Sequence, residues 1–484
     1  MMDVRPVGYV IGLFVLALGV LMLAPAVLDA MSVTGKGGWR AFMASFAITV
    51  AIGGALLLMC RDGRRERLHV DQALLLVVLS WAAIPFFGAL PFMLGENALS
   101  TVDAVFEATS GLTTTGSTVM ERLETMPPGL LLWRALLQWI GGIGIIVFAI
   151  AFLPALRIGG MQLFRSEGFE TDGSSLGKAR DIAASIFSLY SALTIACALV
   201  YGAAGMDAFD AVSHAMTTLA TGGFANYDSS FRNFSPAAQY AAVVFMILAS
   251  LPFVRYLELV RDQGRALLFD PQIRAFLIVL AAAWLCLLAA RLSVADQPTE
   301  LVIRETLFNS VSILTGTGFV TANYILWGAF ALTVFFVISL IGGCAGSTSC
   351  SVKVFRYQIL GAVALAEIKR VRRPNGVFTP RFGGRRISAD VVTSVVVFFF
   401  IFMATLAALS LALAATGLDA ITAISGAATA LANVGPGLGE TIGPYGNFKS
   451  LNDPAKIILI IGMLLGRLEL LSALALLSPS FWRR

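Results

Sequence analysis

Long apolar stretches alternate with short polar segments along this 484-residue chain. About 20 apolar residues are enough for a helix to cross the hydrocarbon of a bilayer. Ten stretches reach that length, near 8–30, 40–60, 72–95, 130–153, 182–204, 237–260, 273–291, 326–343, 391–415 and 455–478. The pattern predicts an all-α membrane protein with ten transmembrane helices. The first stretch has no small-residue cleavage site followed by a polar chain, so we interpret it as a retained helix.

A second pattern lies between the spans, where segments too short to cross the membrane end in Gly and Thr. They follow the third, fifth, seventh and ninth spans and read DAVFEATSGLTTTGS from Asp103, DAVSHAMTTLATGGF from Asp210, ETLFNSVSILTGTGF from Glu305 and TAISGAATALANVGP from Thr422. They align without a gap on Gly116, Gly223, Gly318 and Gly435, with a leucine four positions before each glycine. The first residue of each segment is a candidate helix cap or first-turn residue.

These glycines are 107, 95 and 117 residues apart, which leaves room for one span out of the loop, a connection and one span back. The sequence therefore predicts four repeats of helix, short re-entrant helix and helix. An N-terminal hairpin of two helices precedes them. The predicted boundaries are 1–69 for the hairpin and 70–180, 181–268, 269–386 and 387–484 for the repeats.

Composition and charge set the class and the orientation of the chain. Charged residues make up 13% of it, against about 25% in soluble proteins, which excludes a soluble enzyme. Lys and Arg gather in the loops after the second, fourth, sixth and eighth spans, so we expect this side and both termini to be cytoplasmic. The net charge of +5 follows from this asymmetry and gives no reason to expect nucleic-acid binding. Acidic residues on the opposite side could concentrate cations, or could be ordinary loop residues and helix caps.

The repeated segment has chemistry suited to a cation. A re-entrant helix directs the negative end of its dipole into the membrane. Backbone that follows it at this depth must be buried or line water, and its carbonyls can replace the hydration shell of an ion. Glycine lets such carbonyls converge, while threonine hydroxyls can add ligands or brace the loop. For one segment alone, close helix packing is the better explanation, but four copies in one register favour a pore.

Two features interrupt the apolar stretches on the expected cytoplasmic side of these loops. The eighth stretch breaks into a polar, glycine-bearing segment from Gly342 to Ser351, which indicates either a water-lined loop or a plain helix kink. Arg467 lies in the middle of the last predicted span, and Glu469 is two residues on and thus a poor partner. Arg467 could line the pathway, or could pair with another carboxylate or with loop carbonyls. Lys353 could act in the same way or reach toward the cytoplasm.

The chain resembles the Trk/Ktr/HKT superfamily of potassium transporters, and the TrkH branch most closely. The resemblance rests on FEATSGLTTTGSTV from Phe106, TTLATGGF from Thr217, LTGTGF from Leu314, ANVGPGLG from Ala432, GGCAGSTS from Gly342 and GRLELLSALALLSPSFWR from Gly466. It implies a K⁺ filter made of Thr114, Thr115, Gly116, Thr221, Gly222, Gly223, Gly316, Thr317, Gly318, Asn433, Val434 and Gly435. In relatives, serine in place of the first-loop glycine accompanies sodium transport, so Gly116 implies potassium.

The resemblance also implies a gate below the filter, made of Gly346, Ser347, Thr348, Ser349, Cys350, Ser351, Lys353 and Arg467. The usual glycine triplet of the gating loop reads Ser349, Cys350 and Ser351 in this chain, which puts the ease of opening in question. Implied partners are a TrkA-like cytoplasmic nucleotide-binding ring, docking on the basic loops at 157–180 and 353–386, and a second copy in a homodimer.

We therefore expect a potassium uptake protein of the inner membrane, with K⁺ as its transported ion and no covalent cofactor. Channel-like and proton-coupled flow both stay open. One alternative is a secondary transporter of sodium or another small solute with the same scaffold. Two others are a secondary transporter of an organic substrate, which should show inverted repeats, and a membrane enzyme. An enzyme would need a convergent set of His, Cys or carboxylate side chains, which the sequence does not display.

Overall fold

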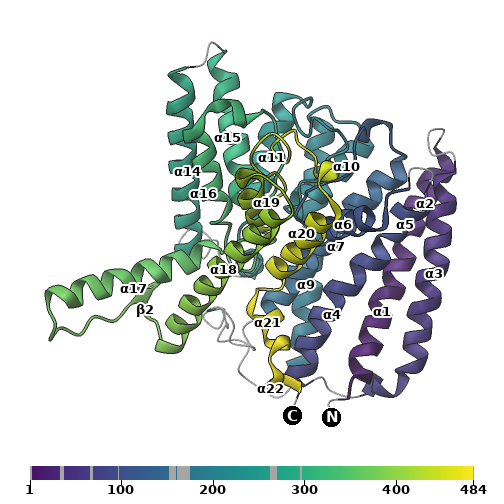
Figure 1. Ribbon diagram of the computed structural model, residues 1–484, viewed down its shortest axis with the longest axis horizontal. Coiled ribbons are helices and arrows are strands. Elements are labelled where there is room, and N and C mark those ends of the chain that lie inside the picture. The colour runs from purple at the N-terminus through teal and green to yellow at the C-terminus, as the bar shows by residue number, and fades with distance from the viewer. Residues whose placement is uncertain are drawn as a thin grey trace.

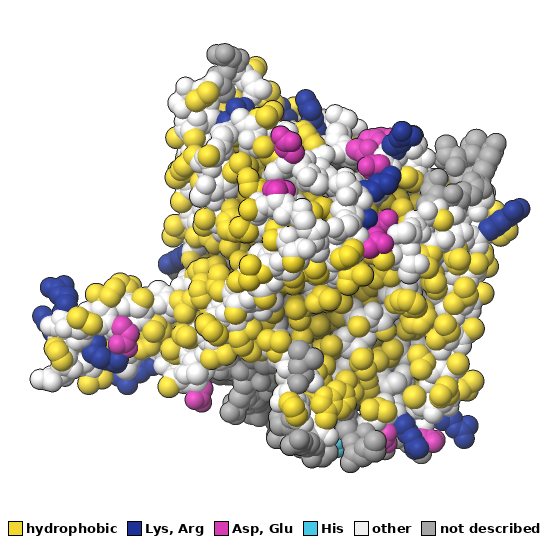
Figure 2. Space-filling view, in the orientation of Figure 1, with side chains coloured by type: hydrophobic (Ala, Val, Ile, Leu, Met, Phe, Trp, Pro, Cys, Tyr) yellow, Lys and Arg dark blue, Asp and Glu magenta, His cyan; other side chains and the backbone are white. Residues whose placement is uncertain are grey.

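The computed structural model is a bundle of helices that run roughly side by side, with both termini at one end (Figure 1). It describes residues 3–32, 37–65, 69–95, 98–151, 160, 175–261, 270–294 and 297–482. We call the end opposite the termini the upper end. Hydrophobic side chains cover most of the visible flank, while charged side chains lie mainly toward the two ends and on a projecting arm (Figure 2). This is the surface expected of a protein whose flanks face lipid.

The long helices account for most of the predicted spans. They are α1 (Arg5–Leu21) continued by α2 (Leu23–Met31), α3 (Gly38–Met59), α4 (Val70–Gly88) continued by α5 (Leu90–Leu94), α7 (Pro128–Ala151), α9 (Ser175–Ala203), α14 (Pro271–Leu292) and α18 (Ala389–Ala415). Within the described residues, seven helical stretches are long and apolar enough to cross a membrane, and an eighth qualifies if a bent pair counts as one span. The chain is thus a multi-span membrane protein.

Three of the ten predicted spans are broken or short. The sixth is split into α11 (Pro236–Ala249) and α12 (Phe253–Arg261), which meet at 90°. Pro252 lies in this break, and proline has no N–H to continue a helix. The eighth is only α16 (Ala329–Ser339), because the glycine-bearing loop follows it. The tenth is divided into α20 (Asp453–Arg467) and α21 (Leu471–Leu477), and α22 (Pro479–Trp482) follows.

Four shorter helices begin toward the upper end and finish inside the bundle. They are α6 (Thr101–Leu112), α10 (Ala208–Leu219), α15 (Thr299–Thr315) and α19 (Ala420–Ala432). Ser100, Asp207 and Asp419 cap three of them by accepting a backbone N–H of the first turn. The predicted first residues Asp103, Asp210 and Thr422 are therefore each the third residue of a helix. Glu305 is further along because α15 begins earlier, at Thr299.

The remaining elements connect or extend this core. Short 3-10 turns are η1 (Arg61–Arg65), η2 (Leu123–Thr125), η5 (Tyr324–Trp327) and η6 (Phe448–Ser450). An arm made of α17 (Val354–Arg372) and the antiparallel pair β1 (Arg381–Phe382) and β2 (Arg385–Arg386) projects sideways from the bundle (Figure 1). The N-terminal hairpin is attached to the bundle by the buried Asp29, whose carboxylate accepts the Gly129 N–H at the start of α7 at 2.6 Å.

Candidate ion pathway

The four glycine segments meet as a closed ring inside the bundle. A Cβ added to Gly116 would overlap the carbonyl oxygen of Gly222, and one added to Gly223 would overlap that of Thr317. A Cβ on Gly318 would lie 2.9 Å from the Gly435 nitrogen, and one on Gly435 would lie 3.1 Å from the Gly116 carbonyl carbon. Each loop thus touches the next, and the fourth touches the first. At Gly116, Gly223 and Gly318, only glycine fits these close backbone approaches.

The backbone conformation repeats from loop to loop in the predicted register. We call the four aligned glycines, Gly116, Gly223, Gly318 and Gly435, the key glycines. Two positions before the key glycine, all four loops hold a left-handed residue: Thr114 at φ 53°, Thr221 at 49°, Gly316 at 80° and Asn433 at 51°. The key glycine is left-handed again in three loops, at 86° for Gly116, 77° for Gly223 and 85° for Gly318. In an extended strand successive carbonyls point in opposite directions, and a left-handed residue at every second position turns them toward one side. Such a conformation is costly for a β-branched residue such as Thr114 or Thr221, so its recurrence marks a constrained site.

Not all of the threonine hydroxyls are available to an ion. Those of Thr115 and Thr317 are hydrogen-bonded to Thr113 at 2.7 Å and Thr315 at 2.8 Å. Thr221 donates to the Ala220 carbonyl at 2.8 Å. By contrast, Thr114 Oγ1 is fully buried without a hydrogen-bond partner in the described structure, as is Oδ1 of Asn433. Buried oxygens without partners are costly, so these two fit a place where water or a cation binds.

Asn433 connects the fourth loop to its neighbours. Its Nδ2 donates to Thr115 Oγ1 at 3.0 Å and to the Met463 carbonyl on α20 at 2.9 Å. Close by in the ring, the Ser117 hydroxyl donates to the Gly435 carbonyl at 2.9 Å. The first and fourth loops are therefore joined by side chains as well as by backbone contact.

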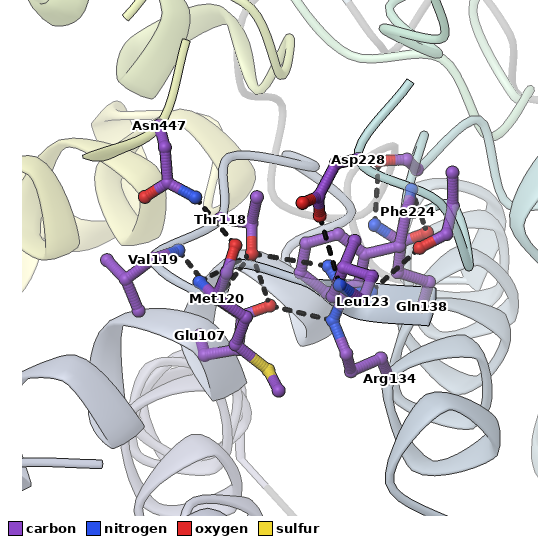
Figure 3. A network of polar contacts seen from close by, with 12 residues as sticks. Glu107, Thr118, Val119, Met120, Leu123, Arg134, Gln138, Phe224, Asp228 and Asn447 are labelled. Atoms are coloured by element: carbon purple, nitrogen blue, oxygen red, sulfur yellow. Dashed lines mark hydrogen bonds and ion pairs between the residues drawn. The ribbon is translucent and has the colours of Figure 1, made fainter. Parts of the chain in front are cut away.

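A buried ion pair stands behind the first loop (Figure 3). The Glu107 carboxylate on α6 accepts from Arg134 Nε on α7 at 2.8 Å, from the Val119 N–H at 2.9 Å and from the Thr118 hydroxyl. Arg134 also donates to the Ala225 carbonyl at 2.9 Å, in the segment after the second filter loop. The pair therefore ties the first two filter loops to α6 and α7, and a buried pair of this kind needs such additional hydrogen bonds.

A cavity of about 410 Å³ opens above the glycine ring. All four key glycines line it, together with residues of the upper loops such as Thr118, Tyr227, Asp228 and Asn447. Most of the acidic side chains near this mouth already have structural partners. Asp103 forms an ion pair with Lys456 at 2.6 Å, and Asp228 accepts the N–H groups of Arg122 and Leu123.

Asp210, on the second pore helix, has a similar structural role. It accepts from Asn226 and from the Tyr227 hydroxyl, whose pKa is raised to about 12 by this bond. Asp419 caps α19. For these residues the simpler expectation of caps and loop contacts is correct.

Below the ring, the glycine-bearing loop predicted as a gate is buried and tied to its surroundings. The Thr348 hydroxyl donates to the Ala249 carbonyl at 2.9 Å, and the Cys344 N–H donates to the Ser250 carbonyl at 3.0 Å. Both acceptors lie at the bend between α11 and α12. The Ser349 hydroxyl accepts the Gly343 N–H at 2.8 Å, and Ser351 donates to the Ser339 carbonyl at 3.0 Å. The residues that replace the usual glycines thus add hydrogen bonds that glycine could not form.

The charges near this loop agree in part with the predicted alternatives. Arg467 is the last residue of α20, and the chain turns through the left-handed residues Glu469 and Leu470 before α21 begins. Arg467 donates to the Gly141 carbonyl at 2.9 Å and contacts Cys350 and the Thr348 carbonyl of the gating loop. Loop carbonyls are thus among its partners, which agrees with the predicted alternative that Arg467 pairs with them.

Glu469 binds two other cations, Arg356 and Lys353, with Lys353 Nζ at 3.6 Å. Lys353 is 3% exposed, so the expectation that it reaches toward the cytoplasm is wrong. Glu107, Arg134, Gln138, Arg356 and Glu469 were not predicted as site residues. For Glu107, Arg134, Gln138 and Glu469 the signal was a polar side chain within an apolar stretch or a pore helix, which is by default a functional hypothesis. Arg356 lies in a basic segment between predicted spans and gave no such signal.

Comparison with known proteins points to one group. The family model for TrkH, described as a cation transport protein, matches residues 39–484. The chain is 45% identical to the Trk system potassium uptake protein TrkI of Halomonas elongata over 415 residues, covering 85% of this chain and 84% of that protein. It is 36% identical to the Trk system potassium uptake protein TrkH of Escherichia coli over the full length of both. The crystal structure of the potassium transporter TrkH from Vibrio parahaemolyticus superimposes with a TM-score of 0.91 at 35% identity, covering 100% of each chain.

Proposed function

The chain belongs to the TrkH family of cation transport proteins, and from this premise we propose that it takes up potassium through its ring of four glycine loops. The observation that carries the proposal is the closure of this ring with left-handed residues at matched positions of all four loops. Potassium would lose its hydration shell to the carbonyl oxygens of the twelve residues predicted as the filter. These residues include no carboxylate, and neutral oxygens suit a monovalent ion better than calcium or magnesium.

The pore helices support this proposal electrostatically. The carbonyl ends of α6, α10, α15 and α19 precede the filter segments directly, so four helix dipoles present their negative ends to the ion. We further propose that each pore helix and its two flanking helices form one of four related repeats. The broken or short helices α11 with α12, α16, and α20 with α21 would then complete ten crossings.

The gate would lie directly below the filter. Residues Gly346 to Ser351, with Lys353 and Arg467, would close the pathway until the loop moves. The contacts of Arg467 with Gly141, Thr348 and Cys350 favour this, because one cation then links the loop to α7 and α20. A positive charge below the filter would also oppose the passage of a cation while the loop is closed.

Regulation would come from the cytoplasmic side. We propose that this side carries both termini, that the protein acts as a homodimer in the inner membrane, and that a TrkA-like nucleotide-binding ring docks on it. The basic arm at 353–386 offers one surface for the ring, with exposed Lys369, Arg370 and Arg372. Most of the other predicted surface, 157–180, lies outside the described residues.

Isotopic rubidium uptake tests the proposal in cells stripped of their own potassium uptake systems. Cells that produce the full chain with a regulatory ring subunit from a relative should accumulate rubidium in a saturable manner. Cells with the empty vector should not. Absence of uptake, with the protein present in the membrane and the partner co-expressed, would refute a potassium transport function.

A further inference from the structure

The second filter loop lacks the internal brace that the first and third loops share. In those two loops, the residue before the key glycine is a threonine whose hydroxyl is bonded to that of the threonine two positions earlier. The second loop has Gly222 and Ala220 at these positions. Gly222 and Gly223 are also consecutive glycines, the most permissive backbone in the ring. This loop therefore needs a brace from elsewhere to hold one conformation.

Gln138 on α7 occupies the place of the missing side chain. A Cβ added to Gly222 would collide with the Gln138 carboxamide. Gln138 Nε2 donates to the Gly222 carbonyl at 2.7 Å, and Oε1 accepts the Phe224 N–H at 3.1 Å (Figure 3). The two bonds grip the peptide groups on both sides of Gly223, and the side chain is fully buried.

We propose that Gln138 is a specificity-determining positioning residue, which fixes the direction of the Gly222 carbonyl and so helps the pore to distinguish potassium from sodium. This inference rests on the proposed function. A carbonyl oxygen has two lone pairs, so the Gly222 oxygen can accept from Gln138 and still face an ion. Selectivity of such a filter depends on the number and field strength of its carbonyls. Without the clamp, the 222–223 peptide can rotate, and the ring loses one oriented dipole.

The fourth loop also lacks the paired threonines and is also braced by a contact from outside the loop. Its equivalent positions are Ala432 and Val434, which cannot form the paired hydroxyls of the first and third loops. There the loop is held through Asn433, which bonds Met463 on α20. A neighbouring helix thus holds the loop in both cases. For the second loop it is α7, which precedes the loop in the chain and contributes the Gln138 side chain, and for the fourth it is α20, whose Met463 carbonyl accepts from the loop.

The test measures rubidium and sodium influx side by side in the uptake-deficient cells, with the full chain and its regulatory partner. Gln138→Met keeps the length of the side chain but removes both bonds, and should lower the rubidium-to-sodium ratio by roughly three- to tenfold while rubidium uptake continues. Gln138→Glu keeps the acceptor for Phe224 but loses the donor to Gly222, and should lower the ratio too. Gln239→Met is the matched control, because Gln239 is equally buried but binds the carbonyls of Phe231 and Phe234, outside the filter.

A rescue variant separates the clamp from general packing. Gln138→Ala with Ala220→Thr and Gly222→Thr makes room at Gly222 and rebuilds the threonine pair of the first and third loops. This variant should recover the wild-type rubidium-to-sodium ratio. If Gln138→Met does not reach the membrane, the rescue variant serves as the test in its place. A wild-type ratio in Gln138→Met, or a rescue variant that transports with a lowered ratio, would overturn the inference. Absence of rubidium uptake by the wild type would instead refute the proposed function.

Discussion

The buried ion pair of Glu107 and Arg134 allows a quantitative prediction. Glu107→Gln preserves the shape of the side chain and an acceptor for the Val119 N–H, but it removes the negative charge 2.8 Å from Arg134 Nε. The Arg134 side chain is 2% exposed and the Glu107 side chain 0%, so water cannot replace the lost carboxylate. Removing one partner of such a pair costs about 3–5 kcal/mol. Because the Val119 contact survives, we expect about 3 kcal/mol, which is roughly a hundredfold in the unfolding equilibrium.

The free energy of unfolding in mixed detergent micelles, from titration with SDS, measures this loss. Glu121→Gln is the matched control, because Glu121 pairs with Lys449 at 2.8 Å but both side chains are about half exposed, and such pairs are worth about 0–1 kcal/mol. The double variant Glu107→Gln with Arg134→Met should be at least as stable as Glu107→Gln alone, since it removes the uncompensated cation. A loss below about 1 kcal/mol in Glu107→Gln, or a double variant less stable than the single one, would refute the reasoning.

Three further predictions concern the gate and the fourth pore helix. Ser349→Ala removes the acceptor of the Gly343 N–H and should raise rubidium uptake without the regulatory partner by up to about tenfold; unchanged uptake would count against a gating role. Glu469→Gln should destabilise the protein by about 3 kcal/mol in the same SDS titration, because Lys353 loses its buried counter-charge, and adding Lys353→Met should recover part of the loss. Hydrogen bonds from Thr422 lower the pKa of Asp419, so its stabilisation of α19 is present above the ordinary pKa and is lost as pH falls through the lowered one. Asp419→Asn should therefore flatten the fall in melting temperature as pH drops below about 4.

The sequence predicts the membrane class and the ring because these depend on local patterns. Apolar length indicates the spans, and the register of Gly116, Gly223, Gly318 and Gly435 identifies the segments that meet. A single chain carries four copies of one signal, so agreement among the copies compensates for the weakness of each. The glycines of these segments indicated positions where a left-handed backbone is allowed. They did not indicate Thr114, Thr221 and Asn433, which adopt the same conformation without being glycine.

The sequence could not predict contacts that depend on which helices are neighbours. Gln138 reaches Gly222 across 84 residues, and Arg356 reaches Glu469 across 113. The periodic pattern of apolar and polar residues does not indicate contacts between residues so far apart in the sequence. The end of α20 at Arg467 was also hidden, because the residues after it are again mostly apolar and a hydropathy pattern does not register a turn at Glu469 and Leu470. In each case, tertiary packing determines which partner a polar side chain meets, whereas the sequence shows only that a polar residue such as Gln138 or Arg467 interrupts an apolar region.

Paired rubidium and sodium influx by the wild type and Gly116→Ser tests the central claim most directly. Gly116 adopts φ 86°, and a side chain there would meet the Gly222 carbonyl, so serine must distort the ring at the point where the first two loops touch. The account predicts that the wild type accumulates rubidium and largely excludes sodium, whereas Gly116→Ser admits sodium. Equal rubidium-to-sodium ratios in the two proteins, with both present in the membrane and transporting, would contradict the claim that this ring selects the ion.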